Sequence, residues 1–317
     1  MEYTTLGRTG LKVSVAGLGC GGNSKVGKGK GQTDDQSVAL IRQAMDLGVN
    51  FFDTARVYGT EKILGEAIKS VPRDSVVISS KHQAGGVSAE HIARAVDVSL
   101  RELDTDYIDI YHLHGVAPET YDHAINVLAP VLLRAQEQGK IRHLGITETS
   151  PHDHGQIMLN RAVNDDCWDV MMLGLNMMNQ VARTQVLPHT IDRKIGTLIM
   201  FAVRNLFSVP GKLQQTTKTL AAEGKVPDGL AESDDPLGFL IHNNGGAESV
   251  IDAAYRFVRH EPGADVVLFG TGNPKHLESN IASILRPPLP EADTQQLTEL
   301  FGHLQGVGFD FPGPAKV

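Results

Sequence analysis

The stretch Gly48-Val49-Asn50-Phe51-Phe52-Asp53-Thr54-Ala55-Arg56-Val57-Tyr58-Gly59 decides the fold of this 317-residue chain. Its apolar run ends at the carboxylate of Asp53, and the segment 60–68 that follows Gly59 repeats apolar residues with helical spacing, with Thr60 as a candidate cap. We therefore expect a strand that ends at Asp53, a loop that holds Tyr58, and a helix. In α/β proteins this edge of the sheet binds ligands. A carboxylate there is costly unless it is paired, so another segment should supply a cation.

The same alternation of strand and helix runs along the whole chain. Eight largely apolar segments are separated by helical patterns, and they lie at 13–19, 49–52, 75–80, 107–113, 141–146, 168–173, 197–202 and 266–269. Nearly continuous apolar strands are typical of a parallel sheet that is covered on both faces. Eight such units predict an α/β (β/α)8 TIM barrel. An N-terminal β-hairpin over residues 2–14 precedes it, and we expect a single barrel domain over residues 1–317.

Two segments carry further local signals. Ser150-Pro151 is a pair that commonly opens a helix, so we expect a helix to begin there. Residues 206–247 have little periodicity, apart from a helical piece near 216–223.

Composition limits the classes of function. The net charge is −8 and no long basic cluster occurs, so we do not expect nucleic acid as a partner. The two cysteines, Cys20 and Cys167, lack metal-ligand spacing and fit a reducing, cytoplasmic compartment. No apolar run reaches the length of about 18 residues that a membrane helix needs, and no secretory signal is visible at the N-terminus. We therefore expect a small-molecule substrate and no membrane, while the oligomeric state stays open.

Polar residues end three of the other predicted strands. Lys81 follows the third strand, His114 closes the fourth, and Thr147-Glu148 follow the fifth. Because the carboxyl ends of barrel strands converge on one mouth, we expect Asp53, Lys81 and His114 to meet beside Tyr58. Each residue alone has a common structural use, but their joint placement favours a site.

This set of residues has a definite chemistry. A free phenol, with a pKa of about 10, is a weak proton donor near neutrality. The ammonium group of Lys81 is expected to lower the pKa of Tyr58, with Asp53 holding the lysine in place. His114 would hydrogen-bond a substrate oxygen or share the proton of Tyr58. Such an acid suits carbonyl reduction by hydride, with the hydride supplied by a cofactor.

The chain resembles the aldo-keto reductase family through several motifs. Asp53-Thr54-Ala55-Arg56-Val57-Tyr58-Gly59 matches the family pattern around its tyrosine, and Lys81 and His114 match its lysine and histidine. Further matches are the stretches 6–14, 99–109 and 270–280, so the resemblance covers roughly residues 2–285. It implies NAD(P)H-dependent reduction of aldehyde or ketone carbonyls, with sugars among the candidates, on a (β/α)8 barrel. Tyr58 would be the general acid, Lys81 and Asp53 would tune it, and His114 would orient the carbonyl.

The resemblance also implies a cofactor site, which departs from the family in places. Its residues would be Gly21, Asp53, Thr147, Glu148, Met172, Gly270, Thr271, Gly272, Asn273, His276 and Asn280. Glu148 stands where the family often has Asn, and as a carboxylate it can accept from a nicotinamide amide but cannot donate. Met172 and Leu175 stand where Gln and a stacking aromatic residue are expected. Gly270 and His276 replace Lys or Arg, which leaves NADP(H) first and NAD(H) close behind, with Lys275 or Arg204 as substitute cations.

Other functions remain open at this stage. Gly17-Leu18-Gly19-Cys20-Gly21-Gly22 fits a dinucleotide-binding pattern, but the glycine- and lysine-rich stretch after it is no helix start. A metal-dependent hydrolase could use His112 and His114, although the next two strands end without histidine. A barrel that binds nicotinamide for regulation or redox sensing is the other alternative.

The substrate pocket is expected from loops, which vary specificity on this architecture. The candidates are residues 22–32, 115–120 and 203–247, together with Phe309 and Phe311. Lysines 25, 28 and 30 would suit an anionic substrate, but a solvated loop is the favoured interpretation. The sequence does not name the substrate.

Overall fold

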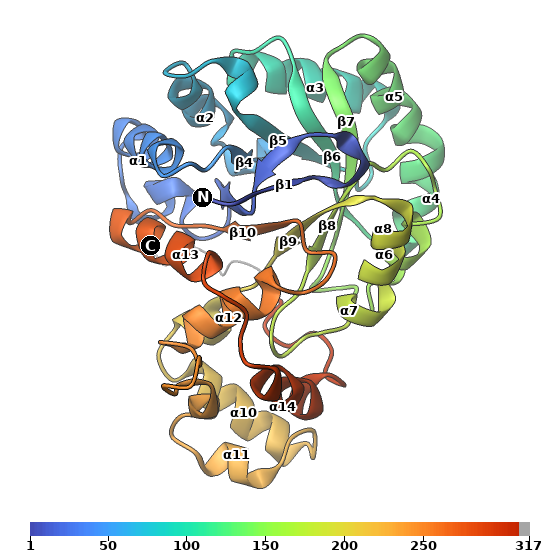
Figure 1. The fold of residues 1–317 in the computed structure, drawn as a ribbon. Helices are drawn as coiled ribbons and strands as arrows, with labels where there is room; N and C mark the ends of the chain where they lie inside the picture. The colour runs from blue at the N-terminus through green and yellow to red at the C-terminus, as the bar shows by residue number, and fades with distance from the viewer. Residues whose placement is uncertain (311–317) are drawn as a thin grey trace.

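The computed structural model describes residues 1–310 and shows a closed barrel of parallel strands (Figure 1). In order around the barrel, the strands are β10 (Val266–Phe269), β3 (Ala16–Gly19), β4 (Phe51–Asp53), β5 (Val77–Gln83), β6 (Ile108–Val116), β7 (Ile141–Glu148), β8 (Val170–Gly174) and β9 (Gly196–Met200). The predicted (β/α)8 TIM barrel is confirmed.

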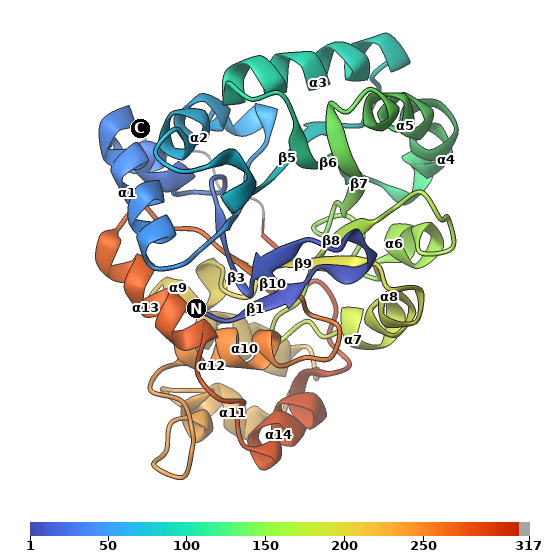
Figure 2. The ribbon, with the colours of Figure 1, turned by 45° about the horizontal axis from the view of Figure 1, so that its top comes forward.

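A ring of helices covers the outside of the barrel (Figure 2). The helices of this ring are α1 (Asp34–Asp46), α2 (Glu61–Ile68), α3 (Ala89–Leu103), α4 (Tyr121–His123), α5 (Ala129–Glu137), α6 (Ile157–Ala162), α7 (Ala182–Gln185), α8 (Leu187–Arg193), α12 (Val250–Arg259) and α13 (Pro274–Ile284). Thr33 caps α1 in a full capping box with Gln36, as its sequence predicts. The buried faces of these helices and of the strands form one continuous apolar core.

The N-terminal hairpin plugs one end of the barrel. Its strands β1 (Tyr3–Thr5) and β2 (Lys12–Ser14) pair antiparallel, and Gly10 at the turn has a left-handed φ of 72°. Leu6 and Val13 pack inside the barrel against Phe51 and other residues near the amino ends of the strands. This hairpin closes the amino-terminal end, so the opposite end is the one available to a ligand.

The predicted first strand is split between these two sheets. Val13 and Ser14 belong to the hairpin strand β2, and the barrel strand begins only at Ala16. Val15 lies at the junction, where its N–H donates to the carbonyl of Glu2. The prediction of a single strand over 13–19 was wrong because the chain turns here from the plug into the barrel wall.

The segment after β9 builds a helical lobe at one side of the barrel. It holds α9 (Asn205–Ser208), α10 (Lys212–Ala222) and α11 (Asp228–Glu232), and α14 (Glu291–Phe301) from the C-terminal region joins them (Figures 1 and 2). The predicted helix near 216–223 is confirmed as part of α10, which begins earlier.

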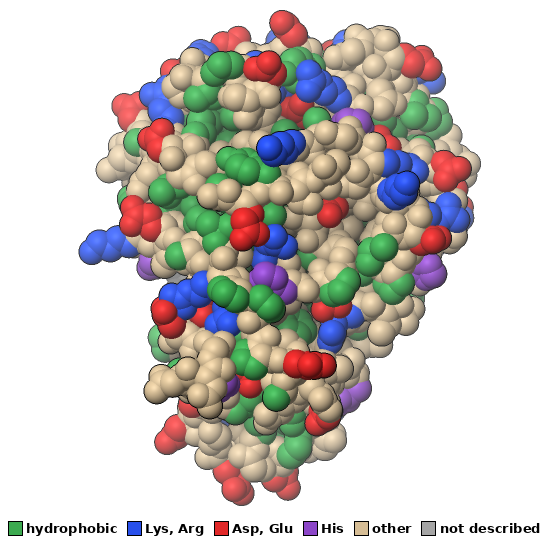
Figure 3. Space-filling model, viewed as in Figure 1, with side chains coloured by type: hydrophobic (Ala, Val, Ile, Leu, Met, Phe, Trp, Pro, Cys, Tyr) green, Lys and Arg blue, Asp and Glu red, His purple; other side chains and the backbone are tan. Residues whose placement is uncertain are grey.

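Acidic and basic side chains are interspersed on the face of the molecule that Figure 3 shows, and neither sign of charge dominates there. Within the described part of the chain, no helix is both long enough and apolar enough to span a membrane.

Candidate active site

Strand register brings the predicted catalytic residues to successive levels of the same end of the barrel. The strands β4, β5 and β6 are neighbours, with Asp53 paired in register to Ser79. Lys81 is level with His112, and His114 lies two residues further along the same strand. Because alternate residues of a strand share a face, Ser79, Lys81 and His114 can all face the interior above Asp53.

Lys81 and Asp53 form a buried ion pair at the centre of this mouth. The Lys81 Nζ donates to both oxygens of Asp53, at 2.7 and 2.6 Å, and to the carbonyl of Thr54 at 2.8 Å. The two side chains have exposed fractions of 1% and 6%. Ser79 Oγ adds a hydrogen bond of 2.7 Å to Asp53. The predicted cation for Asp53 is therefore Lys81, with all three ammonium donor directions used.

Tyr58 stands beside this pair in a short helical turn, η3 (Arg56–Tyr58). The turn ends at Gly59, whose left-handed φ of 69° lets the chain enter α2. Lys81 Nζ lies 5.1 Å from the centroid of the Tyr58 ring, and the His114 ring meets it edge-on at 5.8 Å. The structure therefore brings together the four residues that the sequence selected.

The loop that holds Tyr58 is tied down by hydroxyl groups. Thr54 and Thr60 share a hydrogen bond of 2.9 Å, and Thr60 also donates to the carbonyl of Cys20 at 3.1 Å. Thr60 is the N-cap residue of α2, as predicted, but its side chain makes no capping hydrogen bond because its hydroxyl group is engaged across the loop.

Gly21 makes room for the tyrosine. A Cβ atom at this position would lie 2.4 Å from Cε2 of Tyr58, too close for any real contact. This contact explains why glycine stands at position 21. It does not test the predicted role of Gly21 as a cofactor-binding residue.

Burial dominates the electrostatics of Tyr58. Burial raises the pKa of the Tyr58 phenol above its ordinary value, although the Lys81 ammonium lowers it. For Lys81, burial lowers the pKa, but the attraction of Asp53 and Tyr58 brings it above the ordinary value. The sequence-based expectation of a net lowered pKa for Tyr58 was wrong, because desolvation exceeds the effect of the lysine.

The two histidines of β6 are uncharged. Burial and the nearby Lys81 charge lower the pKa of His114 to about 3. Burial lowers the pKa of His112 well below its ordinary range, and the His112 ring packs on Gly145, where a Cβ would lie 2.1 Å from Nδ1. His114 is thus a neutral hydrogen-bonding group, which suits orienting a substrate oxygen better than carrying a proton as a cation.

Thr147 and Glu148 end β7, next to β6. Thr147 Oγ1 accepts a hydrogen bond of 2.8 Å from the N–H of Gly115. Glu148 Oε1 accepts from the N–H of Gly174, from Ser150 Oγ at 2.9 Å and from Gln156 Nε2 at 3.3 Å. Glu148 Oε2 is buried without a partner among the described residues.

These contacts change two expectations. Burial raises the pKa of Glu148 to about 8, so the side chain is mainly a carboxylic acid near neutrality and can donate as well as accept. Ser150 does not begin a helix, because its hydroxyl group bonds Glu148. The next helix, α6, starts at Ile157, where Asp153 accepts from the first N–H groups.

Two methionines belong to the apolar cluster inside the barrel. Met172 on β8 packs in the interior cluster, and Met200 at the end of β9 contacts the same cluster. Leu175, which the sequence offered as the stacking position, is fully buried in the outer core. Met200 could have been found from its two-residue spacing to the interior Leu198.

The predicted phosphate segment follows β10. Asn273 caps α13 by accepting from the N–H of Lys275 at 2.9 Å, and Thr271 Oγ1 accepts from the N–H of Asn273 at 3.0 Å. His276 and Asn280 are one turn apart on α13 and share a face. A helix N-terminus with an exposed first turn is a suitable place for a phosphate group.

The lysine-rich loop lies against this segment. A Cβ on Gly272 would lie 2.5 Å from the Cα of Gly27, and Gln32 Nε2 donates to the carbonyl of Gly272 at 2.8 Å. Lys25 and Val26 have left-handed φ angles of 43° and 50°. Residues 24–32 therefore border the predicted phosphate site.

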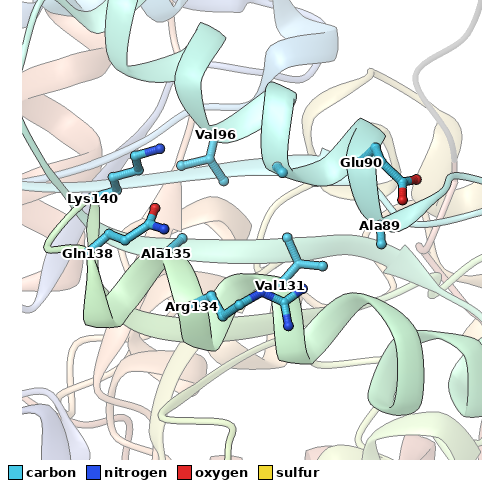
Figure 4. Close-up of a pocket in the computed structure, with 9 residues that line it drawn as sticks. Ala89, Glu90, Val96, Val131, Arg134, Ala135, Gln138 and Lys140 are labelled. Atoms are coloured by element: carbon cyan, nitrogen blue, oxygen red, sulfur yellow. The ribbon is translucent and has the colours of Figure 1, made fainter.

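A separate groove lies on the outside of the barrel between α3 and α5 (Figure 4). Glu90, Arg134 and Lys140 line it with apolar neighbours, and no predicted site residue is among them. Within residues 1–310, no group of three or more His, Cys, Asp or Glu side chains is arranged to hold a metal ion.

Fold and mouth together define a barrel enzyme whose buried lysine–carboxylate pair lies beside a tyrosine. The profile of the Aldo/keto reductase family matches residues 17–301. The chain belongs to the aldo/keto reductase family, a family of oxidoreductases that uses NADP(H).

Individual relatives agree with this assignment. The aldo-keto reductase YhdN of Bacillus subtilis (strain 168) is 32% identical over 308 residues, which cover 88% of this chain and 87% of that protein. The L-galactose dehydrogenase of Arabidopsis thaliana is 38% identical over 209 residues, or 62% of this chain and 64% of that enzyme. The holo form of aldo-keto reductase AKR11C1 from Bacillus halodurans superposes with a TM-score of 0.73, at 20% identity, over 95% of this chain and 96% of its own. This last likeness concerns the fold.

Gly21→Ala should disable the site without unfolding the barrel. The added methyl group would collide with the Tyr58 ring, so we expect the tyrosine to shift and kcat to fall by about 10²-fold. Steady-state kinetics and a thermal melt would measure both effects. Gly85→Ala, where nothing lies within 4 Å of the new Cβ, is the matched control. Full activity of Gly21→Ala would contradict this packing argument.

Glu148→Gln should change how stability depends on pH. The folded-state pKa of about 8 lies above the ordinary value of 4.5, so the folded chain holds a proton that the unfolded chain loses. The stability that Glu148 contributes is present at low pH and is lost as pH rises from about 4.5 through 8, by at most about 1.4 kcal/mol per unit.

Glutamine cannot titrate, so Glu148→Gln should gain stability relative to the wild type as pH increases. Urea unfolding at several pH values from about 5 to 8 would measure the difference, with the exposed Glu119→Gln as the control. A difference that stays constant across this range would show that folded Glu148 is ionised.

Proposed function

We propose that this protein catalyses the reversible NADPH-dependent reduction of aldehydes and ketones, with Tyr58 as the general acid. The observation that carries the proposal is the buried Lys81–Asp53 pair beside Tyr58 and His114 at the mouth of the barrel. Sugars are among the candidate substrates, because the relative from Arabidopsis is by its name an L-galactose dehydrogenase.

Each residue of the mouth has a separate role in the proposed reaction. The nicotinamide cofactor supplies the hydride when it is bound. Tyr58 donates its proton to the substrate oxygen as negative charge develops there. The Lys81 ammonium, fixed by Asp53, stabilises the phenolate that remains. In the reverse direction, the same phenolate would accept the alcohol proton.

His114 and the residues of β7 would position the reacting groups. Because its pKa is held at about 3 by burial and the Lys81 charge, His114 can donate one hydrogen bond from a neutral ring. Glu148 presents a buried Oε2 atom without a protein partner, which fits a hydrogen bond with the nicotinamide amide. Thr147 has a hydroxyl hydrogen left to donate, since its oxygen accepts from Gly115.

The adenosine end of the cofactor would lie along 270–280. Thr271, Asn273 and His276 offer polar groups at the start of α13. An aldo-keto reductase from Klebsiella pneumoniae has been crystallised with NADP and with NADPH. For this chain we rank NADP(H) before NAD(H) by a narrow margin.

Tyr58→Phe tests the role of the acid. Loss of a positioned general acid typically costs 10² to 10⁴ in rate, so we expect kcat to fall by about that factor. NADPH should still bind with unchanged affinity, because the phenyl ring keeps its packing. The assay would follow NADPH oxidation with a panel of aldehydes, ketones and sugars, and Tyr3→Phe, at an exposed tyrosine of the hairpin, is the control.

Turnover that survives Tyr58→Phe would remove Tyr58 as the acid. Tight NADPH binding without turnover of any carbonyl or alcohol would instead favour a regulatory, nicotinamide-sensing barrel.

His276→Ala tests the cofactor preference. If His276 contacts the 2′-phosphate, its loss should raise the KM for NADPH by about tenfold and leave the KM for NADH unchanged. Lys275→Ala is the parallel variant on the same exposed turn. A strong NADPH preference that neither variant alters would place the phosphate-binding cation elsewhere, with the loop lysines 25, 28 and 30 as the next candidates.

A further inference from the structure

Arg204 follows β9 in the segment that leads to α9. Its guanidinium carbon lies 4.5 Å from the centroid of the Phe201 ring, and one of its nitrogens donates to the backbone carbonyl of Asp310. No hydrogen bond or ion pair within residues 1–310 joins Arg204 to the segment 270–276. Its suggested role as a substitute cation for the adenosine phosphate stays a prediction.

The chain next to Arg204 contacts the loop that packs against Tyr58. Asn205, the next residue, accepts from Asn23 Nδ2 at 3.4 Å, and Asn23 belongs to the loop whose Gly21 packs against the Tyr58 ring. The electrostatics agree with this placement: burial raises the pKa of Tyr58, while Lys81 and, more weakly, Arg204 lower it. Arg204 is thus a positive charge within electrostatic range of the proposed acid.

Most N–H groups of the Arg204 guanidinium have no hydrogen-bond partner within residues 1–310. Arginine carries five N–H groups in a planar fork that matches a carboxylate. In the part of the chain that the structure describes, Arg204 has a single hydrogen bond and no ion pair. Burial lowers its pKa, and the charges of Asp310 and Tyr58 only partly oppose this shift. Arg204 is half-buried and forms no ion pair within residues 1–310, so a ligand anion could pair with it without displacing a protein carboxylate. Lys81, by contrast, is fully engaged by Asp53.

The Phe201 ring lies against this cation, and a second aromatic ring packs on Phe201. The Phe201 and Phe309 rings are 5.5 Å apart, and a Cβ on Gly174 would lie 2.7 Å from the Phe309 ring. Phe201 adopts a left-handed φ of 68°, a strained conformation for a residue with a side chain. An apolar surround lowers the local dielectric constant and strengthens an ion pair formed inside it. Phe309 was predicted to line the pocket, whereas Phe311 lies outside the described residues.

We propose that Arg204 binds a carboxylate group of the substrate, so that the enzyme prefers aldehydes and ketones that also carry an acid group. This inference rests on the proposed carbonyl reduction and specifies its substrate class. Arg204 would orient the acid end of the substrate while Tyr58 and His114 hold the carbonyl end. The diphosphate of the cofactor is the competing anion, and the experiment separates the two.

A matched pair of aldehydes tests the proposal. The free acid 4-formylbenzoate and its neutral methyl ester have the same reacting carbonyl and similar shape. We expect the wild type to show a higher kcat/KM for the acid. Arg204→Gln should lower kcat/KM for the acid by about 10- to 100-fold, the usual value of a charge-assisted contact, and change the ester less than threefold. Arg204→Lys should retain part of the preference.

Binding measurements complete the test. Titrations of the protein–NADP⁺ complex with acid and ester, followed by calorimetry, report Arg204-dependent selectivity even if turnover is absent. The Kd of NADPH should be unchanged in Arg204→Gln. Arg42→Gln, at an arginine on α1 that interacts with α2, is the charge control, and a thermal melt checks the fold of each variant.

Three outcomes would overturn the inference. The first is equal treatment of acid and ester by the wild type, in both turnover and binding. The second is a parallel loss for both substrates in Arg204→Gln together with weaker NADPH binding, which would assign Arg204 to the cofactor diphosphate. The third is an acid preference that Arg204→Gln leaves intact. Absence of all carbonyl turnover with Arg204-dependent acid binding would contradict the proposed reaction but not this site.

Discussion

The buried ion pair between Lys81 and Asp53 is the interaction on which the mouth of the barrel depends. Removing two charges from water is expensive, and the pair is tolerable only because each ammonium donor has an oxygen and Ser79 adds a hydrogen bond. This arrangement fixes the lysine under Tyr58 while leaving its charge close enough to act. Burial lowers the pKa of His114, and the Lys81 charge adds to this effect. The ion pair thus acts on both neighbouring groups, in each case together with burial.

Much of this site follows from strand periodicity alone. Asp53, Lys81 and His114 end consecutive strands, and the parallel barrel brings such ends together, so their meeting could be predicted. Ser79 was missed, although its spacing of two from Lys81 places it on the same face. The acid state of Glu148 could not be predicted, because the groups that bury and bond it, including Gly174 and Gln156, come from later segments. The predicted direction of the Tyr58 pKa shift was wrong for a related reason: the sequence identifies the charges around a phenol but not its degree of burial.

Closure of the barrel determines where the loop after β3 lies. Residues 22–32 of this loop were predicted to line the substrate pocket, and the loop also packs on the segment after β10, 240 residues away in the sequence. Closure of the barrel pairs β10 with β3, so the loops that follow these two strands must be neighbours. The same closure brings the chain after β9 to the loop after β3, where Asn23 donates a hydrogen bond to Asn205.

The plug at the other end of the barrel has a consequence for the order of assembly. Arg8 donates to the carbonyl of Trp168 and to Asp169, contacts that join residues about 160 positions apart. Contacts of such long range form late, because a large loop must close before they contribute any stability. During synthesis the hairpin leaves the ribosome before β8 and β9, which carry part of its packing partners. The hairpin is therefore made before these contacts can form, and until then the growing chain must carry the apolar side chains of Leu6 and Val13 without their complete binding site.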